Sequence, residues 1–260
     1  MKAFVFPGQG SQFPGMGYDL YKSNDKVKSL FNEADDILGF TLSNVMFNGT
    51  EEELKQTKIT QPAIFLHSIA ELIVLQEANS PSAVAGHSLG EFSSLVANNT
   101  ISFEDGLKLV FLRAKAMQKS CESSNGTMAA ILGLDDKIIK ETCESFDGYV
   151  TAANFNCPGQ VVISGESNDV KMICEKFNEI GARRSILLPV SGAFHSNLMN
   201  DAKSELKEAI HKTKFNNPTC PIYQNFTGQK TTSIDIIKEN LINQLTAPVL
   251  WTQTINNMVN

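Results

Sequence analysis

Cysteine is scarce and irregularly spaced in this sequence. Five cysteines occur in 260 residues, an odd number, and no two of them are separated by two residues. Disulfide frameworks and structural zinc sites both need paired or regularly spaced cysteines, so neither is expected here. We interpret the cysteines as reduced thiols that pack as small apolar residues, which is typical of a cytoplasmic protein. They are Cys121, Cys143, Cys157, Cys174 and Cys220.

Basic residues and long apolar runs are also few. The 22 Lys and Arg against 28 Asp and Glu give a net charge of −6, which disfavours binding to nucleic acid or to an anionic membrane. The most apolar segment, residues 62–75, contains polar residues and is too short to span a bilayer. The N-terminus lacks the apolar core of a secretory signal. With 42% hydrophobic and 19% charged residues, the composition is that of a globular protein, neither collagen-like nor broadly disordered.

Local signals predict alternating strands and helices in the first 125 residues. An apolar strand over residues 3–6 enters a Pro-Gly turn. Thr50 and Glu53 form a capping box, and a largely buried helix is predicted to start at Thr60, with Pro62 near its first position. A second strand, residues 82–86, turns sharply into a helix, and Ser102 caps the next helix, with Asp105 at its third position.

The middle of the chain has a different order of elements. Strands are predicted over residues 127–132, 149–155, 160–164 and 184–190, with helices over 135–145 and 167–180. The order β-α-β-β-α-β is that of a ferredoxin-like unit. Helices over 200–211 and 233–244 and a strand over 221–226 follow. We therefore predict an α/β fold: a hydrolase-like large domain (1–125 and 191–260) with a central parallel sheet, and an inserted ferredoxin-like α+β subdomain (126–190).

The strongest chemical signal is the pentapeptide Gly86-His87-Ser88-Leu89-Gly90. It follows a predicted strand and opens a predicted helix, which is the setting of a nucleophile elbow. There the hydroxyl of Ser88 would lie at a helix N-terminus, whose free N–H groups stabilise developing negative charge. The alternative is a Gly-rich strand-to-helix turn in which Ser88 only caps the helix.

A serine nucleophile needs a base, and the sequence has four histidines. His195 follows the strand ending at residue 190 and the small-residue turn 191–193, where α/β sites are usually built; a loop histidine without a role is the alternative. His67 is interpreted as a core residue, His211 as a residue at a helix C-terminus, and His87 as pointing away from Ser88. No Asp or Glu stands at an obvious position for the third member of a Ser-His-acid triad. This leaves a carbonyl as the group that would orient the histidine.

The loop after the first strand, residues 7–12, reads PGQGSQ. It matches neither the phosphate-binding loop nor the full dinucleotide fingerprint, so nucleotide binding is only weakly supported. Either it is a plain turn, or its backbone amides and the side chain of Gln9 are donors that face the elbow.

Taken together, the motifs resemble the family of malonyl-CoA:acyl carrier protein transacylases and the related acyltransferase domains of polyketide synthases. The resemblance extends in the family's order from residue 6 to about residue 251. The matching segments are residues 6–12, 60–63, 86–93, 113 with 117–118, 154–163 and 192–196.

The resemblance implies a role for each catalytic residue. Ser88 would attack the malonyl thioester and form a malonyl-serine ester, and His195 would move the protons. Acylation and deacylation would share one site, which predicts ping-pong kinetics. Gln9 and the backbone N–H of Leu89 would form the oxyanion hole. A carbonyl at Gln244 would orient the histidine.

The resemblance also implies which residues bind the substrate. Arg113 would bind the malonyl carboxylate through two parallel hydrogen bonds, which lysine cannot reproduce; without the resemblance, a solvent-facing helix charge is the alternative. Phe194 resembles the malonyl-type enzymes, because its ring leaves less room for an α-methyl group. Met117 and Asn156 would line the cleft, although a helical stripe of the kind that holds Met117 is more often core.

The implied function is malonyl transfer from malonyl-CoA to the phosphopantetheine thiol of acyl carrier protein, in cytoplasmic fatty acid biosynthesis. No cofactor, metal, nucleic acid or membrane is implied. The alternatives are a serine hydrolase or acyl-editing thioesterase that uses water, a polyketide-pathway acyltransferase, and a non-catalytic carrier-docking module. The family continues past residue 260 into a Gly-Pro-Gly-containing strand, turn and helix, so either the sequence is cropped or that piece is absent.

Overall fold

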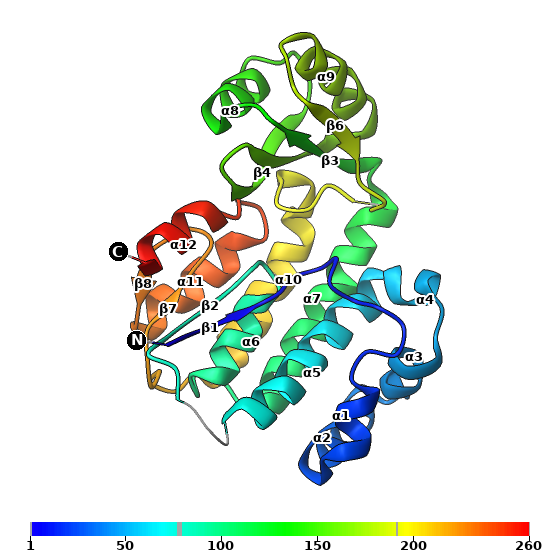
Figure 1. The fold of residues 1–260 in the computed structure, drawn as a ribbon, viewed down its shortest axis with the longest axis vertical. Coiled ribbons are helices and arrows are strands. Elements are labelled where there is room, and N and C mark those ends of the chain that lie inside the picture. Colours follow the sequence, from blue (N-terminus) through cyan, green and yellow to red (C-terminus); the bar gives the residue numbers. More distant parts are fainter. Residues whose placement is uncertain (1, 77–79, 191, 260) are drawn as a thin grey trace. The chain divides into compact units, whose positions relative to one another are not determined.

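The computed structural model describes residues 2–76, 80–190 and 192–259, and the chain divides into two compact units (Figure 1). The first unit contains Met1–Lys115, Leu206–Gln224 and Lys230–Lys238. The second contains Ala116–Glu205, Asn225–Gln229 and Glu239–Asn260. The predicted domain boundaries after residues 125 and 190 stay a prediction.

A small parallel sheet is the centre of the first unit. Its strand order is β1-β2-β7-β8, in which β1, β2 and β7 are parallel and β8 is antiparallel to β7. Helix α6 packs against β1 and β2, so the turn from β2 into α6 lies at the carboxyl end of the sheet. The bounds are β1 Ala3–Phe6, β2 Ala83–Gly86, β7 Ile222–Tyr223, β8 Lys230–Thr231 and α6 Gly90–Ala97.

Helices complete the first unit, and the predicted capping signals are present. Glu53 N donates to Thr50 Oγ1 at 3.2 Å, and Thr50 N donates to Glu53 Oε2 at 2.8 Å. Asp105 N donates to Ser102 Oγ at 3.0 Å. Helices α2, α3 and α4 pack against α5. The bounds are α1 Tyr18–Ser23, α2 Asp25–Leu38, α3 Leu42–Asn48, α4 Glu51–Lys55, α5 Thr57–Gln76 and α7 Phe103–Ser123, the last of which continues into the second unit.

Helix α5 is longer than predicted, so the expected start at Thr60 was wrong. The carbonyl of Gln56 accepts from the N–H groups of both Ile59 and Thr60, which starts the helix earlier and leaves Pro62 inside it. By length and composition α5 is the kind of helix that can cross a membrane, but 61% of its apolar window is buried in the protein. A core helix passes the same test, and the aromatic ring of Phe65 stacks on that of Phe103 at 5.9 Å.

The second unit contains the predicted ferredoxin-like arrangement. Its antiparallel sheet has the order β4-β5-β3-β6. Along the chain the elements follow one another as β3-α8-β4-β5-α9-β6, which confirms the predicted order β-α-β-β-α-β. Helices α8 and α9 pack on this sheet around one apolar cluster. The bounds are β3 Gly126–Leu132, α8 Asp136–Glu144, β4 Val150–Cys157, β5 Gln160–Glu166, α9 Ser167–Glu179 and β6 Arg184–Leu187.

Two predicted strands are shorter in the structure. The strand expected over residues 184–190 ends at Leu187, the last residue paired with β3, and Val190 N donates to Leu188 O in a turn. The strand expected over 221–226 is only β7, because its pairing with β2 covers two residues. The remaining elements are the 3₁₀ turn Asn197–Met199, α10 Asn200–Lys212, α11 Ile234–Gln244 and α12 Trp251–Val259.

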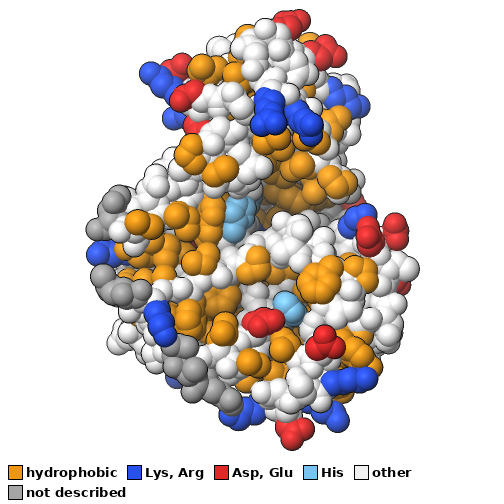
Figure 2. Space-filling model, viewed as in Figure 1, with side chains coloured by type: hydrophobic (Ala, Val, Ile, Leu, Met, Phe, Trp, Pro, Cys, Tyr) orange, Lys and Arg blue, Asp and Glu red, His pale blue; other side chains and the backbone are white. Residues whose placement is uncertain are grey.

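The exposed surface carries charges of both signs. Figure 2 shows acidic and basic side chains interspersed on the face in view. Some of them form ion pairs one helical turn apart, such as Lys137 with Glu141 at 3.8 Å. Exposed pairs of this kind contribute little to stability, so they are best understood as a solvated helix face.

Thiol alkylation should separate the cysteines by burial. Cys157 is exposed and the other four cysteines are buried. Burial raises the pKa of Cys121 and Cys174 to about 11 and that of Cys143 to about 12, so these thiols hold almost no reactive thiolate at pH 8. We expect iodoacetamide to label Cys157 first, as measured by peptide mass spectrometry. Equal labelling of all five in the folded protein would contradict the buried positions.

Candidate active site

Ser88 lies on a tight turn between β2 and α6, and the flanking glycines make that turn possible. A Cβ on Gly86 would lie 1.9 Å from the carbonyl carbon of Gly90, and a Cβ on Gly90 would lie 2.4 Å from Phe6 O. No side chain fits at either position. Ser88 itself has φ of 51°, a left-handed conformation that L-residues adopt at a cost. The G-x-S-x-G pattern is therefore explained by close backbone packing.

Two residues that the sequence analysis selected for their chemistry, Ser88 and His195, have a strained backbone conformation. In the described part of the chain, the non-glycine residues with positive φ are Ser88, Asn99 and His195. Strained residues of this type concentrate at active sites, where the surrounding structure holds them in place. Two of these three residues are the nucleophile and the base expected from the sequence.

The loop that carries Gln9 lies beside the elbow because β1 and β2 are parallel neighbours. Their carboxyl ends meet at Phe6 and Gly86, and His87 N donates to Phe6 O at 3.0 Å. A Cβ on Gly8 would lie 2.6 Å from His87 O, so the two loops are in direct contact. Gln9 is half-buried on this loop.

Leu89 stands between the candidate nucleophile Ser88 and the first residue of α6. Its side chain is buried, and it occupies the N-cap position of the helix. Its backbone N–H is therefore among the first amides of α6, which have no partner within the helix. The first unit thus brings together the elbow, the Gln9 loop and a helix N-terminus.

Arg113 lies next to Ser88, the candidate nucleophile, and is buried, not solvent-facing. Its side chain is 1% exposed. Its Nη2 donates to Ser88 Oγ at 3.0 Å, and its Nη1 donates to Gln61 Oε1 at 2.7 Å. Burial lowers the pKa of Arg113 to about 10, against the opposing effect of Glu91, so the guanidinium remains charged at neutral pH. The structure therefore places a fixed cation within hydrogen-bonding distance of the candidate nucleophile.

Sequence reasoning missed the polar groups around Arg113. Gln61 is in a segment noted only as a helix start and for its resemblance, and Glu91 directly follows the G-x-S-x-G pentapeptide without having been assigned a role. Both are buried. Gln224, the residue directly after β7, donates from Nε2 to Glu91 Oε2 at 3.2 Å. A buried-charge argument could have found Glu91 only if the burial of α6 had been known.

His195 and Gln244 meet in the second unit. His195 Nδ1 is 2.9 Å from the backbone carbonyl of Gln244, the last residue of α11. Since a carbonyl only accepts, Nδ1 must carry the proton, so in the neutral ring Nε2 is the nitrogen that can act as a base. Both residues are almost fully buried. The chain after α11 is held by backbone hydrogen bonds of Val249 with Ala153 and Phe155.

The turn before His195 is closely packed. A Cβ on Gly192 would lie 2.1 Å from Cys121 Sγ, and a Cβ on Gly126 would lie 2.8 Å from Ala193 N. Asn197 N donates to the hydroxyl of Tyr149 at 2.7 Å. Ser191, the first residue of the predicted small-residue turn, is outside the described residues. The turn is thus fixed from several sides.

The remaining predicted substrate residues also belong to the second unit. Phe194 and Met117 are buried, whereas Asn156 is half-buried on β4. The burial of Met117 fits the alternative of a core residue as well as that of a cleft wall. The predicted residues therefore fall into two groups: Gln9, Ser88, Leu89 and Arg113 in the first unit, and Met117, Asn156, Phe194, His195 and Gln244 in the second.

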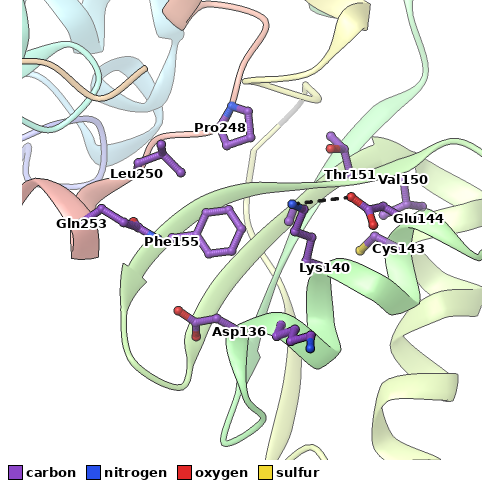
Figure 3. A pocket seen from close by; sticks show the side chains of 12 residues that line it. Asp136, Lys140, Cys143, Glu144, Val150, Thr151, Phe155, Pro248, Leu250 and Gln253 are labelled. Atoms are coloured by element: carbon purple, nitrogen blue, oxygen red, sulfur yellow. Dashed lines mark ion pairs between the residues drawn. The ribbon is translucent and has the colours of Figure 1, made fainter. Parts of the chain in front are cut away.

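Two other hollows contain none of the predicted site residues. One, of about 430 Å³, lies in the second unit, where Phe155 and Pro248 line it and Lys140 pairs with Glu144 at 3.8 Å (Figure 3). The other, of about 440 Å³, lies between β1 and α5. Within the described ranges, no group of three or more His, Cys, Asp or Glu side chains could hold a metal ion.

Comparison with known proteins places the chain among acyltransferases. The malonyl CoA-acyl carrier protein transacylase of Bacillus subtilis (strain 168) is 42% identical over 261 residues, which cover 99% of this chain and 82% of the relative. The acyl-carrier-protein S-malonyltransferase of Bartonella henselae is 38% identical with a TM-score of 0.96, over 100% of this chain and 85% of the other. A malonyl-transacylase solved in complex with its type II polyketide synthase acyl carrier protein is 39% identical, with a TM-score of 0.95 over 99% of this chain and 84% of the other. The sequence pattern of the acyl transferase domain matches residues 3–260, and the chain therefore belongs to the acyl transferase domain family.

Proposed function

We propose that this protein transfers the malonyl group from malonyl-CoA to the phosphopantetheine thiol of acyl carrier protein, through an ester on Ser88. The observation that carries the proposal is the hydrogen bond of 3.0 Å between Arg113 and Ser88. A buried cation beside a nucleophile suits an acyl group that ends in a carboxylate. The names of the relatives, which are malonyl transferases, support the same substrate.

Arg113 selects the acyl group. The malonyl carboxylate accepts two charge-assisted hydrogen bonds from the planar guanidinium, whose orientation is held by Gln61 at 2.7 Å. Acetyl-CoA lacks the carboxylate, and its binding would leave the guanidinium without a charged ligand. The guanidinium thereby also aligns the thioester carbonyl with Ser88 Oγ. Phe194, Met117 and Asn156 are proposed to line the acyl site.

Acylation then requires two proton transfers, one from Ser88 to His195 and one from His195 to the departing CoA thiolate. Nε2 of His195 takes the hydroxyl proton of Ser88 as Oγ bonds to the thioester carbonyl carbon. The oxyanion accepts hydrogen bonds from the Leu89 N–H and the side-chain amide of Gln9. The C–S bond breaks, and the departing CoA thiolate takes the proton from Nε2. The Gln244 carbonyl keeps Nδ1 protonated throughout, so no acidic third residue is needed.

Deacylation repeats the same steps with a different thiol. His195 takes the proton of the phosphopantetheine thiol, the thiolate attacks the ester carbonyl, and Ser88 regains its proton as the leaving group. Because both half-reactions use one site, the kinetics are ping-pong. We propose that the reaction needs no cofactor, takes place in the cytoplasm and serves fatty acid biosynthesis. We also propose residues 126–190 as a subdomain of the enzyme.

Intact-protein mass spectrometry tests this function directly. Mixing the protein with malonyl-CoA should add one malonyl group, located by peptide mapping on the peptide that contains Ser88. Adding phosphopantetheinylated carrier protein should move that group to the carrier. Loss of the group to water at the same rate with and without carrier would indicate a hydrolase, and the absence of any adduct on folded protein would indicate a docking module.

A further inference from the structure

Glu91 is a buried acid in the immediate surroundings of the proposed site. It stands three positions after Ser88, in the first turn of α6, and is 0% exposed. A buried carboxylate is strongly destabilising unless hydrogen bonds and an opposite charge compensate it. A carboxylate with no such compensation would not be retained in this core, so its partners indicate what it does.

Two kinds of partner surround Glu91. Gln224 Nε2 donates to Glu91 Oε2 at 3.2 Å, and the same Nε2 lies 3.2 Å from the carbonyl of Ile237 on α11. The second partner is Arg113, which contacts residues on both sides of Glu91 in the chain: Ser88 Oγ at 3.0 Å and the ring of Phe92 at 5.8 Å. The negative charge of Glu91 accordingly raises the pKa of the Arg113 guanidinium against the effect of burial. The helix N-terminus adds a smaller favourable effect on the carboxylate. Glu91 is therefore held by the framework of the first unit and interacts with Arg113 before any substrate arrives.

The other groups around Arg113 fix its direction but carry no charge. Gln61 accepts from Nη1, the hydroxyl of Ser88 accepts from Nη2, and the ring of Phe92 lies 5.8 Å from the guanidinium carbon. Neutral partners satisfy hydrogen bonds without neutralising a buried cation. Among the interactions described above, Glu91 supplies the counter-charge.

We infer that Glu91 is a specificity-determining residue: it is the resident counter-charge of Arg113 and sets how tightly the site binds a substrate carboxylate. The inference rests on the proposed function. While the site is empty, as it is after each transfer, the Glu91 carboxylate stabilises the buried guanidinium. When a malonyl group is bound, the two carboxylates share one cation and repel each other, which moderates binding and favours turnover over retention.

The Glu91→Gln variant tests this role, because it keeps the shape and removes the charge. We expect the KM for malonyl-CoA to fall by roughly threefold to tenfold, with the KM for acetyl-CoA unchanged. The melting temperature of the free protein should fall by about 5–10 °C. Addition of malonyl-CoA should raise the melting temperature of the variant by more than it raises that of the wild type. Glu104→Gln, on the exposed side of α7 in the same unit, is the matched control and should change neither value.

An unchanged or higher KM for malonyl-CoA in folded Glu91→Gln would overturn the inference and leave Glu91 a structural residue. A double variant covers the case in which Glu91→Gln does not fold. Glu91→Gln with Arg113→Met removes both charges, so it should melt above Glu91→Gln alone; a double variant no more stable than the single one would overturn the charge coupling. Failure of the wild type to form malonyl-serine would contradict the proposed function instead, and the melting comparison would still decide the coupling.

Discussion

Replacement of Ser88 by alanine is expected to lower malonyl transfer at least ~10³-fold, because no other group can form the acyl ester. The Gln9 loop, the Leu89 amide and Arg113 remain in Ser88→Ala, so malonyl-CoA should still bind. The measurement is CoA release in the presence of carrier protein, together with the acyl adduct by mass spectrometry. Turnover within tenfold of the wild type would contradict the nucleophile assignment.

Stability separates a chemical effect from misfolding in this series. Ser88 has φ of 51°, which glycine adopts without steric cost. Ser88→Gly should therefore melt at or above the wild-type temperature while being equally inactive. Ser82→Ala, at an exposed serine just before β2, is the control that should retain activity. A Ser88→Gly variant that is inactive and also unfolded would leave the loss of activity attributable to folding.

Replacement of Arg113 by alanine is expected to lower kcat/KM for malonyl-CoA by about 10²–10³-fold, since two charge-assisted hydrogen bonds to the carboxylate are lost. Arg113→Lys should recover only part of this, because an ammonium cannot form the bidentate pair. The pKa of about 10 means that the wild-type guanidinium is charged at the assay pH, so the loss reports a cation and not a neutral group.

Acetyl-CoA is the internal control for the arginine variants. It carries no carboxylate, so its kcat/KM should stay the same or rise, and the preference for malonyl over acetyl should collapse. A preference equal to that of the wild type would show that Arg113 does not select the acyl group. Arg113→Ala also leaves Glu91 buried without its cation, so a lower melting temperature is expected and must be measured alongside the rates.

Elements encoded by local chemistry were predictable. The capping box at Thr50, the strand before the elbow and the β-α-β-β-α-β order all depend on residues close together in the chain, and each is present. The start of α5 was missed although nearby residues set it: the carbonyl groups of Gln56 and Leu54 accept from Thr60, and the helix begins before the Thr60-Gln61-Pro62 signal. The length of β7 was also missed, since the pairing with β2 decides it.

The same division applies to the site. The sequence alone determined the tight strand-to-helix turn at Ser88, because glycines on both sides of Ser88 are a local requirement of such a turn. Only the tertiary structure decided that Arg113 is buried against Ser88 and Gln61, and that Glu91 is paired with Gln224, 133 positions away. Burial and charge compensation depend on which distant segments pack together, and the pattern of one segment does not contain that information. A helix arginine that the sequence alone would place in solvent is, for this reason, the central cation of the proposed site.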